Sequence, residues 1–333
     1  MTRRPSENSA RFGSRVEARP IEGFSPWRHR FALLTAGSTL VLIFVGGLVT
    51  STGSSLSVPD WPLSYGQFFP PMVGGVIYEH GHRMVGGAVA LATAALAIWT
   101  WREEPRAWVR RLAVAALAAV LLQALLGGVT VLLRLPTAVS VSHAALAQAF
   151  FCLVSALALV TGPDWLSGLP AENGDRELSS LAAITTAAIY LQLLLGAVMR
   201  HTGSGLAIPD FPLAFGALVP PITSFGIGIH FAHRVGALIV GGLVLATAAR
   251  VFVAHRDDRR RLRGAALMIA LLALQIALGA AIIWTRKAVT PTTAHVAIGA
   301  ALLVTSLVLA LRSRRRATAV DWPPEAIARR VSV

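Results

Sequence analysis

Eight long hydrophobic stretches, separated by polar or turn-forming segments, dominate the pattern along the chain. Each is long enough to cross a bilayer core as a helix, which takes about 20 residues. They predict membrane-spanning helices near residues 31–50, 77–100, 111–133, 138–161, 179–199, 227–253, 264–285 and 289–311. The pattern therefore predicts an all-α integral membrane protein with eight transmembrane helices.

The second half of the chain repeats the first. Residues 50–71 and 200–221 are identical at 11 of 22 positions without a gap, and both contain a Pro-Asp-aromatic-Pro-Leu element. Each repeat holds four predicted helices, an even number, so both halves enter the membrane from the same side. We therefore expect two parallel-repeat four-helix bundles related by a pseudo-two-fold axis along the membrane normal.

The repeat divides the chain into five segments. Two four-helix halves are joined by a polar cytoplasmic linker and flanked by basic cytoplasmic tails. In chain order we expect an N-terminal tail at 1–30, the first half at 31–161, the linker at 162–178, the second half at 179–311 and a C-terminal tail at 312–333.

Charge is sparse and unevenly placed. Charged residues make up 14% of the chain against 55% hydrophobic residues, whereas soluble domains carry about 25% charged residues. Most arginines lie in the two tails and in the loops after the second and sixth stretches, so both termini are expected in the cytoplasm of a multi-pass cell (inner) membrane protein. The basic residues behind the net charge of +14 are then expected to contact anionic lipid headgroups. Nucleic-acid binding is not expected, because the sequence has no basic soluble domain to support it.

Four histidines recur near the outer ends of the even-numbered helices: His82, His143, His233 and His295. Ligand side chains inside a membrane are costly and are functional candidates. Neutral imidazole binds iron, copper or zinc. Two histidines per half, without a cysteine or further carboxylate at that depth, favour a macrocycle iron with two axial ligands over tetrahedral zinc. A hydrogen-bonded core histidine is the alternative, but it does not explain four at one depth.

An arginine follows the first histidine of each pair, as Arg83 and Arg234. Guanidinium groups at this depth either pair with heme carboxylates, for which their bidentate geometry is suited, or extend to the membrane interface.

Two further histidines make the repeat alignment ambiguous. His80 lies about 200° round the helix from His82, so the two cannot bind one iron together. A shift of 150 residues pairs His80 with His230, whereas a shift of 151 keeps both His-Arg pairs aligned and places Glu79 opposite His230. The second alignment is preferred. His80 and His230 are then neighbours of the metal-binding groups, although either remains a rival iron ligand.

Glu79 distinguishes the two halves. It lies three residues before His82, on the same helix face. A carboxylate is needed where a proton moves or a cationic intermediate is stabilised, and an electron-transfer heme does not require one. We therefore expect chemistry in the first half and a permanent cofactor in the second. The alternative is an interfacial carboxylate paired with Arg83 at i+4.

At these residues the chain resembles the heme A synthase family. The resemblance rests on the eight-helix duplicated plan and on the elements Glu79-x-x-His82-Arg83, His143, His233-Arg234 and His295. It implies a membrane oxidoreductase that oxidises a ring methyl of heme O to a formyl group, giving heme A for terminal cytochrome oxidase. It implies heme O at His82 and His143 with Glu79 as the catalytic residue, and a heme b cofactor at the second pair. Residues 51–76 lack the cysteine pair of some members, so a loop disulfide has no part here.

The resemblance also sets the expected partners. Heme O is the substrate, the electron donor is unidentified, and heme O synthase and cytochrome oxidase assembly factors are candidate contacts, as is a second copy of the chain. Both heme sites are expected toward the outer face. The main alternative is a di-heme membrane cytochrome that only transfers electrons, which predicts two equivalent sites and no need for Glu79.

Overall fold

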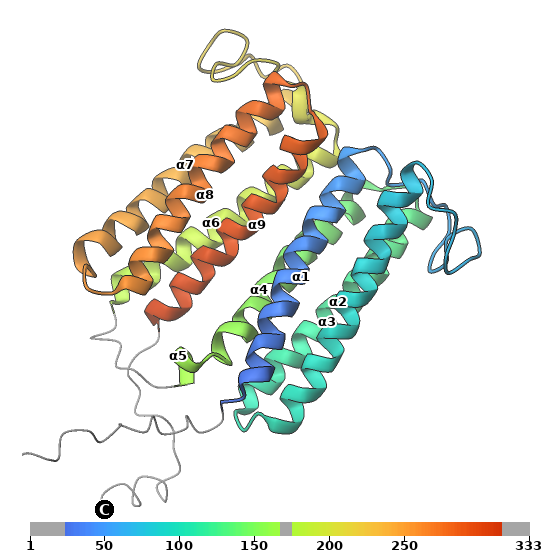
Figure 1. The fold of residues 1–333 in the computed structure, drawn as a ribbon. Helices are drawn as coiled ribbons and strands as arrows, with labels where there is room; N and C mark the ends of the chain where they lie inside the picture. Colours follow the sequence, from blue (N-terminus) through green and yellow to red (C-terminus); the bar gives the residue numbers. More distant parts are fainter. Residues whose placement is uncertain (1–23, 167–174, 315–333) are drawn as a thin grey trace, which may run out of the picture.

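Eight helices long and apolar enough to cross a membrane make up most of the computed structural model, which describes residues 24–166 and 175–314 (Figure 1). They are α1 (Pro26–Ser51), α2 (Gly75–Glu103), α3 (Ala107–Leu132), α4 (Thr137–Val160), α6 (Arg176–His201), α7 (Phe225–Ala254), α8 (Arg259–Trp284) and α9 (Val289–Arg314). Two short helices, α5 (Pro163–Leu166) and the 3₁₀ helix η1 (Ser204–Leu206), complete the set, and the described residues form no β-strand beyond two isolated bridges. The prediction of an all-helical, multi-pass membrane protein is confirmed.

Four helices, α1, α6, α7 and α8, begin before the hydrophobic stretches because a polar side chain caps the N-terminus of each. The Ser25 side chain accepts the backbone N–H of Arg28, with Pro26 at the first helical position, so α1 begins before residue 31. Asp258 caps α8 in the same way by accepting the N–H of Arg261. Such caps satisfy the N–H groups that a helix leaves open. Hydrophobicity alone places these helix starts too late.

The predicted tails and linker fall largely outside the described residues. The tails at 1–30 and 312–333 and the linker at 162–178 overlap residues 1–23, 315–333 and 167–174. Within the described part, α1 begins inside the first of these predicted segments and α5 lies inside the linker.

Each half is a ring of four helices. In the first half α1 contacts α2, α2 contacts α3, α3 contacts α4 and α4 returns to α1; α6 to α9 repeat this order. Consequently α2 lies diagonally across from α4, and α7 from α9. The halves meet through α1 with α9, α4 with α6 and α4 with α9, and the two long loops lie at the end opposite α5 (Figure 1).

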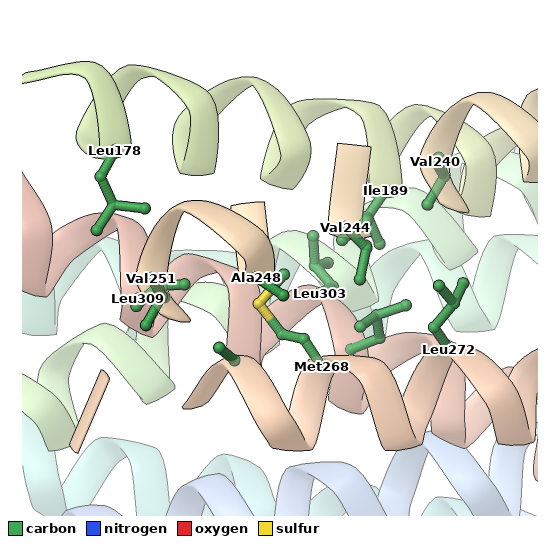
Figure 2. Packing of buried hydrophobic residues seen from close by; sticks show 12 residues of the cluster. Leu178, Ile189, Val240, Val244, Ala248, Val251, Met268, Leu272, Leu303 and Leu309 are labelled. Carbon is green, nitrogen blue, oxygen red and sulfur yellow. The ribbon is translucent and has the colours of Figure 1, made fainter. Parts of the chain in front are cut away.

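Apolar side chains fill the middle of each bundle. In the second half, buried residues from all four helices pack together, among them Ile189, Val244, Met268 and Leu303 (Figure 2). Another cluster joins α9 to the first half through Ala300. Because lipid is as apolar as leucine, close van der Waals packing and buried hydrogen bonds must hold such helices together. This packing fixes the helix ends that carry the polar residues.

A buried ionic cluster ties the first half together near α5. Glu104 Oε2 lies 3.0 Å from Arg28 Nη2, and its Oε1 lies 2.6 Å from Arg106 Nε; the Glu104 side chain is 1% exposed. Arg106 also donates to the carbonyl of Val160 at 3.0 Å. The cluster therefore links α1, the α2–α3 turn and α4.

Glu104→Ala is expected to lower the free energy of unfolding by about 3–5 kcal/mol, because it leaves buried cationic groups without the carboxylate that they share. Thermal unfolding in detergent, followed by circular dichroism, measures this. Glu177→Ala is the matched control, since its carboxylate is 73% exposed beside Arg250 and exposed pairs contribute about 0–1 kcal/mol. Equal losses in the two variants would contradict the assignment.

Candidate functional site

The two long loops, residues 52–74 and 202–224, are built on the same aspartate-centred turn. Asp60 accepts the backbone N–H groups of Tyr65 at 2.7 Å and Gly66 at 2.8 Å, and Asp210 does the same in the second loop. Hydrogen bonds from Gly66 and then Tyr65 hold the pKa of the Asp60 carboxyl below its usual range. Tyr65 and Gly66 both have positive φ, 52° and 70°, which the aspartate bonds support. Both loops therefore have a defined shape over the helix ends.

The repeated arginines hold these loops in place. Arg83 Nη1 donates to the carbonyls of Asp60 at 2.7 Å and Leu63 at 2.8 Å. Arg234 donates to the equivalent carbonyls of the second loop at 2.6 and 2.8 Å. The geometry gives both arginines a loop-anchoring role that hydrophobic patterning did not reveal. Their pairing with heme carboxylates stays a prediction.

Glu79 and His230 occupy equivalent places. Glu79 Oε2 accepts the backbone N–H of Val58 at 2.9 Å, and His230 Nδ1 accepts that of Ile208 at 3.2 Å. The helix residues in these contacts follow the preferred 151-residue alignment, whereas their loop partners Val58 and Ile208 are 150 residues apart. Glu79 is 4% exposed, and its Oε1 lies 2.8 Å from Arg83. The ion pair of the alternative interpretation is therefore present, and a catalytic role for Glu79 has to coexist with it.

His80 lies beneath the first loop. Its Nδ1 is 2.8 Å from Ser64 Oγ, and its buried Nε2 has no hydrogen-bond partner within the described residues. The 151-residue alignment places Phe231 at this position in the second half, so the polar contact belongs to the first half alone. In residues 24–166 and 175–314, no three His, Cys, Asp or Glu side chains gather as a metal cluster.

Each of the four repeated histidines lies against a glycine of the preceding helix. A Cβ atom added to that glycine would lie 3.0–3.4 Å from the imidazole Cε1, closer than nearly all real Cβ contacts. The pairs are His82 with Gly46, His143 with Gly127, His233 with Gly196 and His295 with Gly279. Sequence reasoning did not connect these glycines with the histidines, although Gly46 and Gly196 recur at the repeat spacing. The glycines leave room for the Cε1 edge of each ring against the neighbouring helix.

Glutamines hold the second histidine of each pair. Gln123 Nε2 donates to the carbonyl of His143 at 3.0 Å and lies 3.3 Å from its Nε2. Gln275 Nε2 lies 3.2 Å from His295 Nε2. The recurrence of these glutamines in the sequence therefore corresponds to one repeated contact between neighbouring helices.

A third glutamine appears only in the second half. Gln192 Nε2 lies 3.0 Å from His233 Nδ1 and donates to the His233 carbonyl at 2.7 Å. Its repeat counterpart is Leu42, which offers His82 no hydrogen bond. His233 is thus held more firmly than His82, since a bond to Nδ1 fixes the imidazole orientation.

The paired histidines suit a flat ring bound from both faces. His82 on α2 and His143 on α4 come from diagonal helices of one bundle, as do His233 on α7 and His295 on α9. The Nδ1 atoms of His82, His143 and His295 are buried without a hydrogen-bond partner among the described residues. Two buried imidazoles from diagonal helices, each beside a glycine, are a donor set that could hold a heme iron.

Gly196→Val is expected to lower the affinity for heme in the second half by about 10–100-fold, because the added side chain occupies the position of the His233 ring. Spectroscopic titration of the purified protein with heme measures the affinity. Gly242→Val on α7 is the matched control, since an added Cβ there meets nothing within 4 Å. An unchanged heme affinity in Gly196→Val would show that heme binding does not depend on the contact between His233 and Gly196.

Comparison with known proteins gives a consistent result. The profile of the cytochrome oxidase assembly protein family (COX15-CtaA) matches residues 75–308. A heme A synthase of Symbiobacterium thermophilum is 36% identical over 265 residues, which is 75% of this chain and 83% of that protein. A heme A synthase of Bacillus licheniformis is 29% identical, over 75% of this chain and 84% of that protein. A heme A synthase of Halalkalibacterium halodurans is 28% identical, over 86% of this chain and 97% of that protein.

The family match extends from α2 into α9, so it contains both histidine pairs, Glu79 and both loop-anchoring arginines. The match does not include α1 or the first long loop, and therefore leaves out Gly46 and Asp60, but it contains the whole second copy of the repeat as far as residue 308. The chain belongs to the cytochrome oxidase assembly protein family.

Proposed function

We propose that this protein is a heme A synthase, a membrane oxidoreductase that oxidises one ring methyl of heme O to a formyl group to give heme A. The similar heme A synthases support the reaction. One structural observation carries the assignment: two histidine pairs have the same glycine-seated geometry, but only the first is accompanied by a buried carboxylate, Glu79. A di-heme cytochrome would need no such difference.

The two halves take different hemes in this proposal. The first half, residues 31–161, binds heme O at His82 and His143, and the second, residues 179–311, binds heme b at His233 and His295. The firmer hold on His233 through Gln192 supports a permanent cofactor there. A substrate must enter and leave, and the first half has Leu42 at that place.

A pseudo-two-fold axis along the membrane normal relates the two halves. The contacts support it, because every neighbour relation within the first ring recurs in the second, and the α1–α9 contact recurs as α6–α4. The axis brings both heme sites to the end of the bundle that carries the long loops.

Glu79 is the proposed catalytic residue. Conversion of a methyl to a formyl group replaces two hydrogens by one oxygen, so protons and electrons must leave the carbon. In this proposal the Glu79 carboxylate accepts a proton or stabilises positive charge as that carbon is oxidised. Its contacts with Arg83 and the Val58 N–H support the role by fixing the carboxylate in position. Bound heme b would supply one-electron redox chemistry.

We place the protein in the cell (inner) membrane with both termini in the cytoplasm. The described chain ends and α5 lie at one end of the bundle, and the loops lie at the other (Figure 1). Arginines between α2 and α3 and between α7 and α8 mark the cytoplasmic end. Heme O synthase, cytochrome oxidase assembly factors and a second copy of the chain are the proposed protein contacts.

The test is acid–acetone extraction and mass-resolved chromatography of the hemes in protein purified from a host that makes heme O. The proposal expects heme B together with heme O, heme A or a partly oxidised form. Heme B alone, at about two per chain, would replace the enzyme with the electron-transfer cytochrome.

A further inference from the structure

Arg200 reaches from the second half into the first. It lies in the last turn of α6, and its Nη2 donates to the Gly47 carbonyl of α1 at 2.8 Å and to Ser51 Oγ at 2.9 Å. Thr293 of α9 donates to the same Ser51 hydroxyl at 2.9 Å. Three helices from both halves therefore meet at the Ser51 hydroxyl, which accepts from both Arg200 and Thr293.

This guanidinium lies beside the second histidine pair. Gly196, one turn earlier on the same face of α6, is the seat of His233. Thr293, which shares the Ser51 hydroxyl with Arg200, lies two residues before His295, the other member of the pair. A positive charge therefore adjoins the proposed heme b site at its loop-side end.

Arg200 has no acidic partner in the described part of the chain. No carboxylate there lies within ion-pair distance of it, and its Nε and Nη1 groups make no hydrogen bond with described residues. The side chain is nevertheless partly buried. A charged group in such a place normally pairs with an opposite charge, so the arrangement calls for an anion.

Only the second half has an arginine at this position of the repeat. The repeat places Thr50 opposite Arg200, so the first half has no equivalent guanidinium. In the first half, Arg200 binds the carbonyl of Gly47. Gly47 follows Gly46, the glycine that contacts His82. The first half thus contributes the groups that orient a cation beside the second-half site.

We propose that Arg200 binds a propionate carboxylate of the heme held at His233 and His295. One N–H group on Nε and two on Nη1 remain, and any of them can donate a charge-assisted hydrogen bond to a carboxylate. Gly47 and Ser51 orient the guanidinium, so the first half completes the cofactor site of the second. A cation at a heme edge stabilises the reduced iron and raises the reduction potential. The inference rests on the proposed heme b site.

Arg200→Gln and Arg200→Lys in the full-length protein test this inference. We expect Arg200→Gln to release heme b to apomyoglobin about tenfold faster than the wild type, and to lower the midpoint potential of that heme. Arg200→Lys should recover the potential, since the charge returns, but only part of the retention, because lysine lacks the planar donor geometry with which Arg200 binds Gly47 and Ser51 and still presents an N–H group to the carboxylate. Arg134→Gln is the control, because this exposed arginine of the α3–α4 turn should change neither property.

Unchanged release and potential in Arg200→Gln would overturn the proposal. A lower melting temperature with both heme properties unchanged would overturn it too, and would leave Arg200 as a tie between helices. If Arg200→Gln fails to accumulate, Ser51→Ala is the second test, because it removes a hydroxyl that orients the guanidinium group. It should change the heme release rate and the midpoint potential in the same direction as Arg200→Gln, but by less. If neither property changes in Ser51→Ala, the proposal is contradicted. Wild-type protein without heme b would instead refute the proposed function.

Discussion

Replacing His295 by alanine is expected to remove the heme from the second half and to abolish conversion of heme O. An axial ligand contributes more than the orienting groups around it, whose loss costs about 10–100-fold in affinity. Gln275, whose Nε2 lies 3.2 Å from His295 Nε2, could not replace the imidazole, because an amide is a much weaker iron ligand. The pyridine hemochrome assay counts the hemes per chain, and chromatography of the products measures conversion.

Thr292→Ala supplies the control for this experiment. Thr292 lies on the same helix, one turn before His295, and its hydroxyl bonds only to the Ala288 carbonyl. It should keep both hemes and full conversion. A His295→Ala protein with an unchanged heme count would show that the second pair does not bind iron.

Glu79→Gln is expected to slow the conversion of heme O by about 10²–10⁴-fold, the range of general acid–base catalysis, while heme content and spectra stay close to those of the wild type. The amide can still accept the Val58 N–H and keeps the shape of the side chain, so the loop stays anchored. Single-turnover conversion of bound heme O separates the chemical step from binding.

Two variants separate catalysis from loop anchoring. His230→Gln alters the equivalent anchor in the second half and should leave the chemical step unaffected. Arg83→Gln removes the ion pair and a loop contact but keeps the carboxylate, so it should slow conversion less than Glu79→Gln. Equal slowing by Arg83→Gln and Glu79→Gln would make Glu79 an anchor, and full conversion in Glu79→Gln would end its catalytic role.

The sequence by itself determined the membrane class, the eight helices and the duplication. Bilayer thickness sets the length of a spanning helix, and the apolar stretches have that length, so no long-range information is needed. The same holds for the repeated histidines, because a ligand inside a membrane is rare enough to stand out in a linear pattern. Helix ends were missed by several residues where a cap such as Ser25 or Asp258 decides them.

Only the tertiary structure decided which partner each polar group meets. Arg83 binds the carbonyls of a loop about 20 residues away. Glu79 and His230 each accept a backbone N–H of their loop. Each repeated histidine contacts a glycine of a neighbouring helix. Arg200 bonds to a helix of the other repeat, 153 residues away. Helical periodicity fixes the face on which a residue lies, but the helix opposite that face follows from how the two rings pack. That packing depends on contacts among all eight helices at once.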